Sequence, residues 1–425
     1  MRNSWLVEPG SALRPAIGSY ERALALNPGK YEALHNLGNV FQSQGRLEAA
    51  KECYEKVLIS QPNYAKAWHS LGTIFHSLGD MDAALAQYRA ALALQSDFAE
   101  AAFGESLAQL FRGEFSTGWR NYERRWQSKE HVTPMRSYPQ PLWSGAKLAT
   151  GRLLIWGEQG VGDEIMFAGL IPDVVSINNS CLLECDSRLR PLFARSFPDV
   201  QVISSRLSAQ EDLRSQEPAA EVDFSAHLPS GSLPRLFRKN RASFAAAPYL
   251  IPDPVARKTF RARYADGRRL IGLAWHTNNR KTGRSRSVEL SLFASLFARP
   301  DIRWISLQYG DRESLEKQAS AAAAPVLIDL SVDQFANIDL FAAQIAALDL
   351  VVTIDNSTAH LAGALGFPHL FCCRSRQIGD RCKRATSAFG IRACDSSGKQ
   401  QEAIGTQWYK EYAMPCKLVI AKQRV

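Results

Sequence analysis

The sequence has little that would place it in a membrane or a secretory pathway. Its apolar runs all fall short of the roughly 20 residues that a membrane-spanning helix needs, and residues 1–9 lack the apolar stretch of a signal peptide. The eight cysteines follow no regular spacing, and five of them lie after residue 370, so a disulfide framework is not indicated. We therefore expect a reduced, cytoplasmic protein without a membrane span.

Positive and negative residues nearly balance over most of the chain. The formal net charge is +9, but residues 371–425 hold 11 Lys and Arg against 4 Asp and Glu, which leaves the rest of the chain almost neutral. A broad basic surface for nucleic acid is therefore not expected. With 46% hydrophobic and 22% charged residues, the 425-residue chain has the composition of a folded protein of two or three domains, which excludes intrinsic disorder.

A period of 34 residues runs through the first quarter of the chain. Residues 31–64 and 65–98 match at small and aromatic positions, among them Ala33/Ala67, Leu37/Leu71, Gly38/Gly72, Phe41/Phe75 and Tyr54/Tyr88. Such a period indicates stacked helical pairs, and the pattern resembles the tetratricopeptide repeat. We predict a repeat solenoid over residues 13–126. It begins with the second helix of an incomplete repeat, so the true start of the protein could lie upstream or another element could cap the repeat. It ends in a degenerate unit.

The repeats have two interpretations at this stage. They could serve as a scaffold or oligomerisation surface, or they could form a groove that holds a protein partner or a peptide acceptor. Asn36 and Asn39 are expected on the concave side, where their amides could hydrogen-bond an extended peptide backbone.

After the repeats the helical period stops. Residues 127–150 contain Pro134, Pro139 and Pro141, which break helices, so we expect a linker. Buried strands then alternate with helices in two blocks, residues 151–252 and 268–425, joined near 252–267. This pattern predicts two facing Rossmann-like halves with a cleft between them, and ligands at the carboxyl ends of the strands.

The first loop at such a strand end is rich in glycine. Gly157, Gly160 and Gly162 allow close approach of a backbone, but their Gly-x-x-Gly-x-Gly spacing is not that of dinucleotide-binding proteins. Asp163 follows at the start of the next helix. Its carboxylate could cap the helix, or it could be a general base for a substrate hydroxyl, and the residue types do not decide between the two.

Two further loops favour an anion. Residues 276–286 contain four cations and no acid, and Arg280, Lys281 and Arg286 could neutralise phosphate charge, although a solvated charge run is the plainer alternative. Residues 355–360 open a helix whose first N–H groups would point at an anion. This third loop consists of Asp355, Asn356, Ser357, Thr358, Ala359 and His360. The histidine could bind a phosphate or ribose, or it could be a core residue. We find no cluster with metal-ligand spacing.

Taken in this order, the loops resemble the family-nine glycosyltransferases, the group of the ADP-heptose lipopolysaccharide heptosyltransferases, and more closely the bacterial proteins that fuse tetratricopeptide repeats to such a domain. The stretches that carry the resemblance are Gly157–Phe167, Arg286-Ser287, Ser306–Gln308 and Leu348–Gly363. It implies a GT-B fold and inverting, metal-independent transfer of a sugar from a nucleotide. Donor and acceptor do not carry over from the family; we expect an ADP- or UDP-linked sugar as donor and a hydroxyl of a glycan or protein as acceptor.

The resemblance also assigns roles. Asp163 would be the general base in the acceptor half. Arg280, Lys281 and Arg286 would face the diphosphate, and Asp355–His360 would bind the donor. The alternative is a non-catalytic adaptor that works through its repeats and carries a degenerate transferase-like domain.

The chain departs from the family pattern after residue 370, where cysteine and positive charge become frequent. We interpret this as a frameshift near codon 371, which would leave the donor site incomplete. A metal site at Cys372, Cys373, Cys382 and Cys394 is the competing interpretation.

Overall fold

The chain divides into two units, Met1–Glu130 and His131–Val425. The computed structural model describes residues 13–131, 133–205, 222–244, 247–277, 283–367, 369–373 and 419–421. Within those residues, no helix combines the length and the apolarity that crossing a membrane requires.

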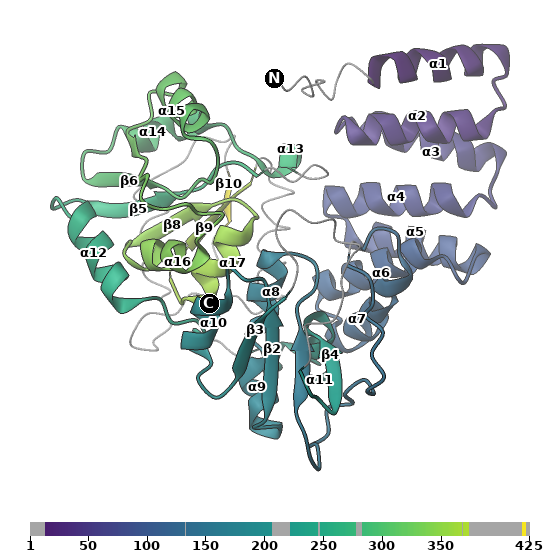
Figure 1. Ribbon diagram of the computed structural model, residues 1–425. Coiled ribbons are helices and arrows are strands. Elements are labelled where there is room, and N and C mark those ends of the chain that lie inside the picture. Colours follow the sequence, from purple (N-terminus) through teal and green to yellow (C-terminus); the bar gives the residue numbers. More distant parts are fainter. Residues whose placement is uncertain are drawn as a thin grey trace, which may run out of the picture. The chain divides into compact units, whose positions relative to one another are not determined.

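The first unit is a stack of antiparallel helices (Figure 1). Its helices are α1 (Leu13–Leu26), α2 (Tyr31–Ser43), α3 (Leu47–Ser60), α4 (Ala65–Leu78), α5 (Met81–Leu94), α6 (Ala99–Arg112) and α7 (Phe115–Tyr122), followed by the 3-10 turn η1 (Glu123–Gln127). The paired helices α2–α3 and α4–α5 reproduce the two predicted repeats, and α1 is the predicted second helix of an incomplete one. The repeat solenoid is thus confirmed.

Tyrosine rings packed on glycines explain why the repeat has both residues. A Cβ on Gly72 would lie 2.5 Å from Cε1 of Tyr88, and one on Gly104 would lie 2.7 Å from the same atom. Tyr54 stands in the same relation to Gly38, at 2.6 Å. Both tyrosines are buried. Each ring therefore fills the space that a side chain on the first helix of a repeat would need, which fixes how closely neighbouring helices approach.

Two repeat-related histidines occupy aromatic surroundings in this stack. His69 lies with its ring centroid 5.9 Å from that of Tyr88 and 5.1 Å from that of Phe98. His35 Nε2 is 3.1 Å from Ser70 Oγ. Burial lowers the pKa of both imidazoles, that of His69 to about 4. Both rings are therefore neutral parts of the core at pH 7.

The second unit contains two sheets. The first has the order β3-β2-β1-β4 and is parallel throughout; its strands are β1 (Leu153–Trp156), β2 (Cys181–Cys185), β3 (Gln201–Ser204) and β4 (Ala226–Pro229). Its helices are α8 (Val161–Ala168), α9 (Ile171–Ile177), α10 (Arg190–Ser196) and α11 (Leu233–Phe237), with short turns η2 (Ser230–Ser232) and η3 (Arg241–Ser243).

The second sheet has the order β10-β9-β8-β5-β6-β7. Its strands are β5 (Arg269–Leu273), β6 (Ile302–Ser306), β7 (Val326–Leu327), β8 (Leu350–Thr353), β9 (His369–Cys373) and β10 (Val419–Ala421). Its helices are α12 (Pro254–Tyr264), α13 (Gly283–Arg286), α14 (Ala294–Phe297), α15 (Arg312–Ala321), α16 (Ile338–Ala346) and α17 (Ser357–Ala364), with the turn η4 (Leu290–Phe293). The predicted fold class, a repeat solenoid followed by two Rossmann-like halves of the GT-B type, is confirmed.

The segment after the repeats packs on the first sheet. Leu142 bridges to His227 of β4, and the Trp143 N–H donates to the His227 carbonyl at 2.8 Å. The buried guanidinium of Arg136 forms an ion pair with Glu184 of β2 at 2.7 Å. The helices do stop at residue 127, as the prolines predict, and residues 131–143 then belong to the second unit. The predicted domain boundaries themselves remain predictions.

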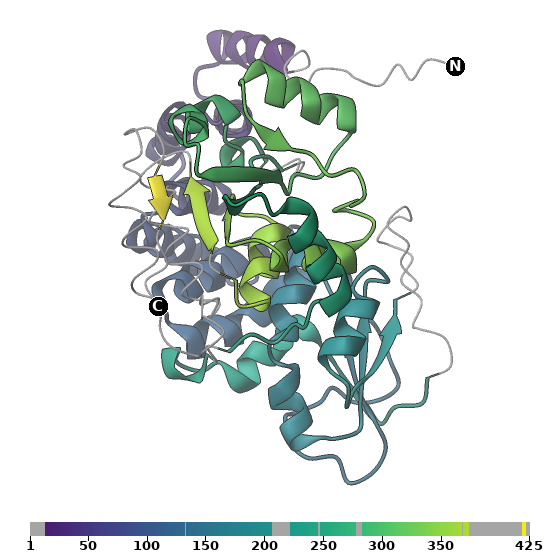
Figure 2. The same ribbon diagram turned by 90° about the vertical axis from the view of Figure 1, so that its left-hand side faces the viewer.

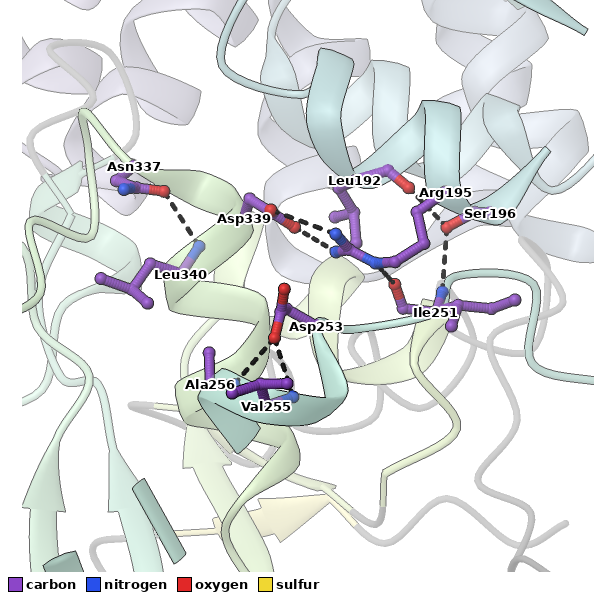
Figure 3. A network of polar contacts seen from close by, with 10 residues as sticks. All are labelled: Leu192, Arg195, Ser196, Ile251, Asp253, Val255, Ala256, Asn337, Asp339 and Leu340. Carbon is purple, nitrogen blue, oxygen red and sulfur yellow. Dashed lines mark hydrogen bonds and ion pairs between the residues drawn. The ribbon is translucent and has the colours of Figure 1, made fainter. Parts of the chain in front are cut away.

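The two halves of the second unit are fastened at α10 and α16. Arg195 forms a bidentate ion pair with Asp339 and also donates to the Ile251 carbonyl at 2.8 Å (Figure 3). Ser196 accepts a hydrogen bond from the Ile251 N–H at 2.9 Å. The connecting segment at Ile251 is therefore hydrogen-bonded to α10 of the first half, just before the chain enters the second half.

The end of the chain is described only in part. Residues 419–421 pair antiparallel with β9 and appear as the yellow arrow beside it in Figure 2. Residues 374–418 lie outside the described residues, including Cys382 and Cys394. The frameshift and the cysteine metal site remain predictions.

The tyrosine–glycine packing predicts the effect of one methyl group. Gly72→Ala should destabilise the repeats by about 1–3 kcal/mol, because the methyl has no room against the Tyr88 ring. Gly18→Ala is the matched control, since a Cβ at Gly18 meets nothing within 4 Å, and it should be neutral or slightly stabilising. Urea unfolding of the full chain, with hydrogen exchange in residues 65–98, measures both. Equal effects of the two variants would refute the packing argument.

The half-buried His69 predicts a pH dependence. Because the folded pKa of His69 is below the ordinary 6.5, the unfolded state binds more protons between pH 6.5 and about 4, and stability falls as pH drops through that window. His69→Phe, which places at residue 69 the side chain found at the equivalent Phe103, should reduce this fall. Hydrogen exchange in α4 at pH 7.5 and 5.0 reports it; an unchanged pH dependence in the variant would contradict the assignment.

Candidate functional site

Two helix starts from opposite halves meet in the second unit. Helix α8 follows the glycine loop after β1, and α17 follows β8 (Figure 1). A Cβ on Gly162 would lie 3.3 Å from His360 Cδ2 and 3.6 Å from Ser357 Cα. The missing side chain at residue 162 therefore lets the first turn of α8 pack directly on the first turn of α17.

Asp163 stands on this first turn of α8. Its Oδ2 accepts a hydrogen bond from the Gly160 N–H at 3.3 Å. Burial raises the pKa of the carboxyl to about 6, the Gly160 bond and the Arg286 charge lower it, and the negative charge of Glu158 raises it. Both roles considered for this residue are thus compatible in one side chain: it caps the helix, and it has a pKa close to that of an efficient base at neutral pH.

The glycine loop before Asp163 is held in a defined shape. Gln159 has φ 66°, the left-handed region that favours glycine, and its N–H donates to Thr133 Oγ1 at 2.7 Å. A Cβ on Gly157 would lie 2.7 Å from the carboxyl carbon of Glu164, whereas one on Gly160 would meet only Asp163 Oδ2, at 3.7 Å. Packing therefore disfavours any side chain at Gly157, whereas a Cβ at Gly162 would need a shift of only a few tenths of an ångström in His360.

Glu164 connects the same first turn of α8 to the end of β2. Its Oε2 accepts from the Asp186 N–H at the end of β2, at 2.8 Å. Burial raises the pKa of this carboxyl to about 8, so it is protonated at pH 7. The cavity beside it, about 10 Å³, has room for one water at most and cannot hold a sugar.

The start of α17 presents polar groups that lack partners. Asn356 caps the helix: its Oδ1 accepts from the Ala359 N–H at 3.3 Å and from Thr353 Oγ1 at 3.0 Å. Asn356 Nδ2 and His360 Nδ1 are buried and have no hydrogen-bond partner among the described residues. Burial lowers the pKa of His360, so its imidazole is neutral. No described residue satisfies these two nitrogens, which makes them candidates for binding a ligand.

Arg286 brings positive charge to the same place. It forms an ion pair with Asp355 at 3.3 Å, with both side chains partly exposed, and its charge lowers the pKa of both Asp163 and His360. The structure thus brings together Asp163, Arg286, Asp355 and His360 from three loops that the sequence places far apart. Ser357 is half-buried and Thr358 buried in the first turn of α17.

The remaining cations of the second loop are not placed. Arg280 and Lys281 lie outside the described residues, so their predicted contact with a diphosphate remains a prediction. Metal binding is a separate question: in the parts of the chain that the structure describes, no three His, Cys, Asp or Glu side chains are grouped as metal ligands.

Gln308 has a role that the sequence did not indicate. Its Oε1 accepts from the N–H groups of Trp275 and His276, at 3.0 and 2.8 Å, and its Nε2 donates to the His276 carbonyl at 3.0 Å. One side chain after β6 thereby ties down the start of the loop after β5. In the sequence, Gln308 is marked only by its place in Ser306–Gln308, one of the stretches that carry the family resemblance.

Comparisons with known proteins agree with the repeat array. A tetratricopeptide repeat family model matches residues 35–102. Protein FlbA from Caulobacter vibrioides is 32% identical over 282 residues, which cover 63% of this chain and 46% of FlbA. The chain therefore spans less than half the length of this curated relative.

Two solved structures illustrate the likenesses found. MamA is 25% identical over 28% of this chain and 69% of its own, with a TM-score of 0.26. An O-GlcNAc transferase from Thermobaculum terrenum is 14% identical over 96% of this chain and 91% of its own, with a TM-score of 0.32. At such TM-scores neither likeness bears on function.

The raised pKa of Asp163 predicts that its ionised carboxylate lowers the free energy of unfolding at neutral pH. Since the folded pKa is above the ordinary value, the folded state binds the extra proton, and its stability falls as pH rises through about 6. Asp163→Asn should therefore raise the Tm of the second unit at pH 7.5 by about 2–5 °C, and the gain should shrink toward pH 4. Calorimetry of the full chain measures this; a lower Tm for the variant at pH 7.5 would show that the ionised carboxylate is stabilising.

Proposed function

We propose that the chain is an inverting glycosyltransferase that moves a sugar from a nucleotide-sugar donor to a hydroxyl acceptor. The observation that carries the proposal is the position of Asp163, a carboxyl of pKa about 6, beside the start of α17 with its buried, unpartnered nitrogens. Transfer of a sugar needs a base for the acceptor hydroxyl and an anion site for the donor diphosphate. Here the two candidate groups come from opposite halves.

The reaction follows from these groups. Asp163 takes the proton of the acceptor hydroxyl while that oxygen attacks the anomeric carbon of the donor sugar. A carbon–oxygen bond forms on one face, and the bond to the diphosphate breaks on the other, so the configuration inverts. The departing nucleoside diphosphate carries the electron pair of the broken bond.

The leaving group has its counter-charges on the second half. Arg286 and the N–H groups at the start of α17 would face the diphosphate, with Asn356 Nδ2 and His360 Nδ1 as further donors. Arg280 and Lys281 would add positive charge. These cations and N–H groups can stabilise the developing negative charge in place of a divalent metal, which supports metal-independent transfer from an ADP- or UDP-linked sugar.

The acceptor is a glycan or a protein. A protein acceptor is favoured by the repeats, whose solvent-exposed Asn36 and Asn39 offer amides for a peptide backbone. Tyr54 Oη–H donates a hydrogen bond to Asn39 Oδ1 at 2.8 Å. This bond fixes the orientation of the Asn39 amide group, including its nitrogen.

The second candidate function is a non-catalytic adaptor that binds a partner through its repeats. The repeat match over residues 35–102 fits this function as well as the first. The two differ in what they require of Asp163: the adaptor does not need its carboxylate.

The test is Asp163→Asn in the full chain. Transfer should fall at least about 100-fold, because Asn cannot accept the proton, while donor affinity stays within about threefold. Release of ADP or UDP from their sugars, measured with peptide and glycan acceptors, gives the rate, and calorimetry gives the affinity. Asp173→Asn removes a carboxylate of the same half that pairs with Arg238 and should remain active. Full activity of Asp163→Asn would refute the base.

A further inference from the structure

Glu158 is a buried acid in the glycine loop, five residues before Asp163. The residue is only 2% exposed, although it lies just beyond the carboxyl end of β1, in the loop between Gly157 and Gln159. An acid at such a position is costly unless its oxygens find partners. The partners identify what the residue does.

One oxygen of Glu158 spans the gap between two strand ends. Its Oε1 accepts a hydrogen bond from the Gly231 N–H at 2.8 Å. Gly231 follows β4, and β1 and β4 are the neighbours between which the strand order of the first sheet reverses. A Cβ on Gly231 would lie 2.5 Å from this oxygen. The glycine is therefore required by the carboxylate.

The other oxygen faces the segment that follows the repeats. Glu158 Oε2 lies 3.4 Å from His131 Nε2, and both side chains are almost fully buried. The next residue, Gln159, donates its N–H to Thr133 in the same segment. Three separate parts of the chain are thus joined at the loop: His131 and Thr133, the loop itself and the turn after β4.

The loop that Glu158 holds is the one that fixes Asp163. Gly160, two residues after Glu158, donates the hydrogen bond that Asp163 Oδ2 accepts. The charge of Glu158 also acts on Asp163 directly and raises its pKa, after burial, which is the larger cause. Glu158 therefore affects both the place of the Asp163 carboxylate and its charge.

We propose that Glu158 is a positioning residue for Asp163: its buried carboxylate ties the glycine loop to the turn after β4, and its negative charge opposes a second negative charge on Asp163. The proposal rests on the proposed function, in which Asp163 is the base. In that function it explains how the base keeps its proton affinity near neutral pH although Arg286 acts in the opposite direction.

The other titratable groups around Asp163 are accounted for. Arg286 of α13 lowers its pKa. Glu164 on α8 is protonated at pH 7, and His360 on α17 is neutral. Asp355, before α17, is paired with Arg286, and His131 is the group that faces Glu158 itself. Among these, Glu158 is the acid whose charge can be removed without removing its hydrogen bond.

Glu158→Gln makes that separation, because the amide oxygen can still accept from Gly231. The experiment is a carbon-13 NMR titration of the full chain with labelled aspartate, in which Asp163 is assigned by its absence in Asp163→Asn. The midpoint of Asp163, about 6 in the wild type, should move to lower pH in Glu158→Gln. Asp173→Asn, which removes a charge from an ion pair elsewhere in the same half, should leave the midpoint unchanged.

The pH dependence of turnover is the companion measurement, with release of ADP or UDP from their sugars as the probe. In Glu158→Gln the acid limb of kcat should shift in the same direction as the titration, and the plateau should fall less than tenfold because the base is weaker. Glu158→Ala, which also loses the hydrogen bond, should lose more than tenfold in kcat with little change in donor affinity. If Glu158→Ala does not fold, the Gln variant decides alone.

The outcomes separate the two proposals. An Asp163 midpoint that does not move in Glu158→Gln overturns the role of Glu158, whatever the turnover. If Asp163→Asn is fully active, the proposed function fails, even where the titration behaves as expected. A shifted midpoint with an inactive Asp163→Asn supports both.

Discussion

The close approach of α8 and α17 is the constraint on which the site depends. Because Gly162 has no side chain, the first turn of α8 can lie against His360 and Ser357, and Asp163 on the next position comes under the influence of Arg286. A Cβ at residue 162 would require His360 to shift by a few tenths of an ångström, at the place where the proposed base and the proposed anion-binding helix start meet. The contacts of Arg195 with Asp339 and Ile251 hold the halves elsewhere, so this approach is supported on more than one side.

The same physical device recurs in the repeats. Tyr88 packs in the space left by Gly72 and Gly104, just as the carboxylate of Glu158 packs in the space left by Gly231. In each case a large or charged side chain from one element occupies the volume that a neighbouring glycine gives up. The glycines of this chain are therefore informative about contacts as well as about backbone conformation, since eight of those described have a positive φ.

Much of the fold could be predicted from the sequence because its signals are local. The 34-residue period places the Tyr–Gly contacts in register, and buried apolar runs such as Leu153–Trp156 predict the strands. Strand ends then give the loops of Asp163, Arg286 and Asp355. The contacts of Glu158 and Gln308 could not be predicted this way. Gly231 lies 73 residues from Glu158 and follows β4, a four-residue strand containing His227 and Pro229 that lacks an apolar run.

Binding of a nucleoside diphosphate to the second half tests the central claim most directly. Calorimetry or thermal shift of the full chain with ADP, UDP, GDP and their sugars, with CMP-linked sugars, the bare nucleosides and NAD as comparisons, would measure it. Ligand at 100 times its Kd should stabilise the protein by about 2.7 kcal/mol. We predict that an ADP or UDP compound binds and that Arg286→Met weakens the diphosphate but not the nucleoside, while Arg286→Lys weakens it less. Absence of binding by every nucleotide, together with binding of a peptide to the repeats, would contradict the transferase and establish the adaptor.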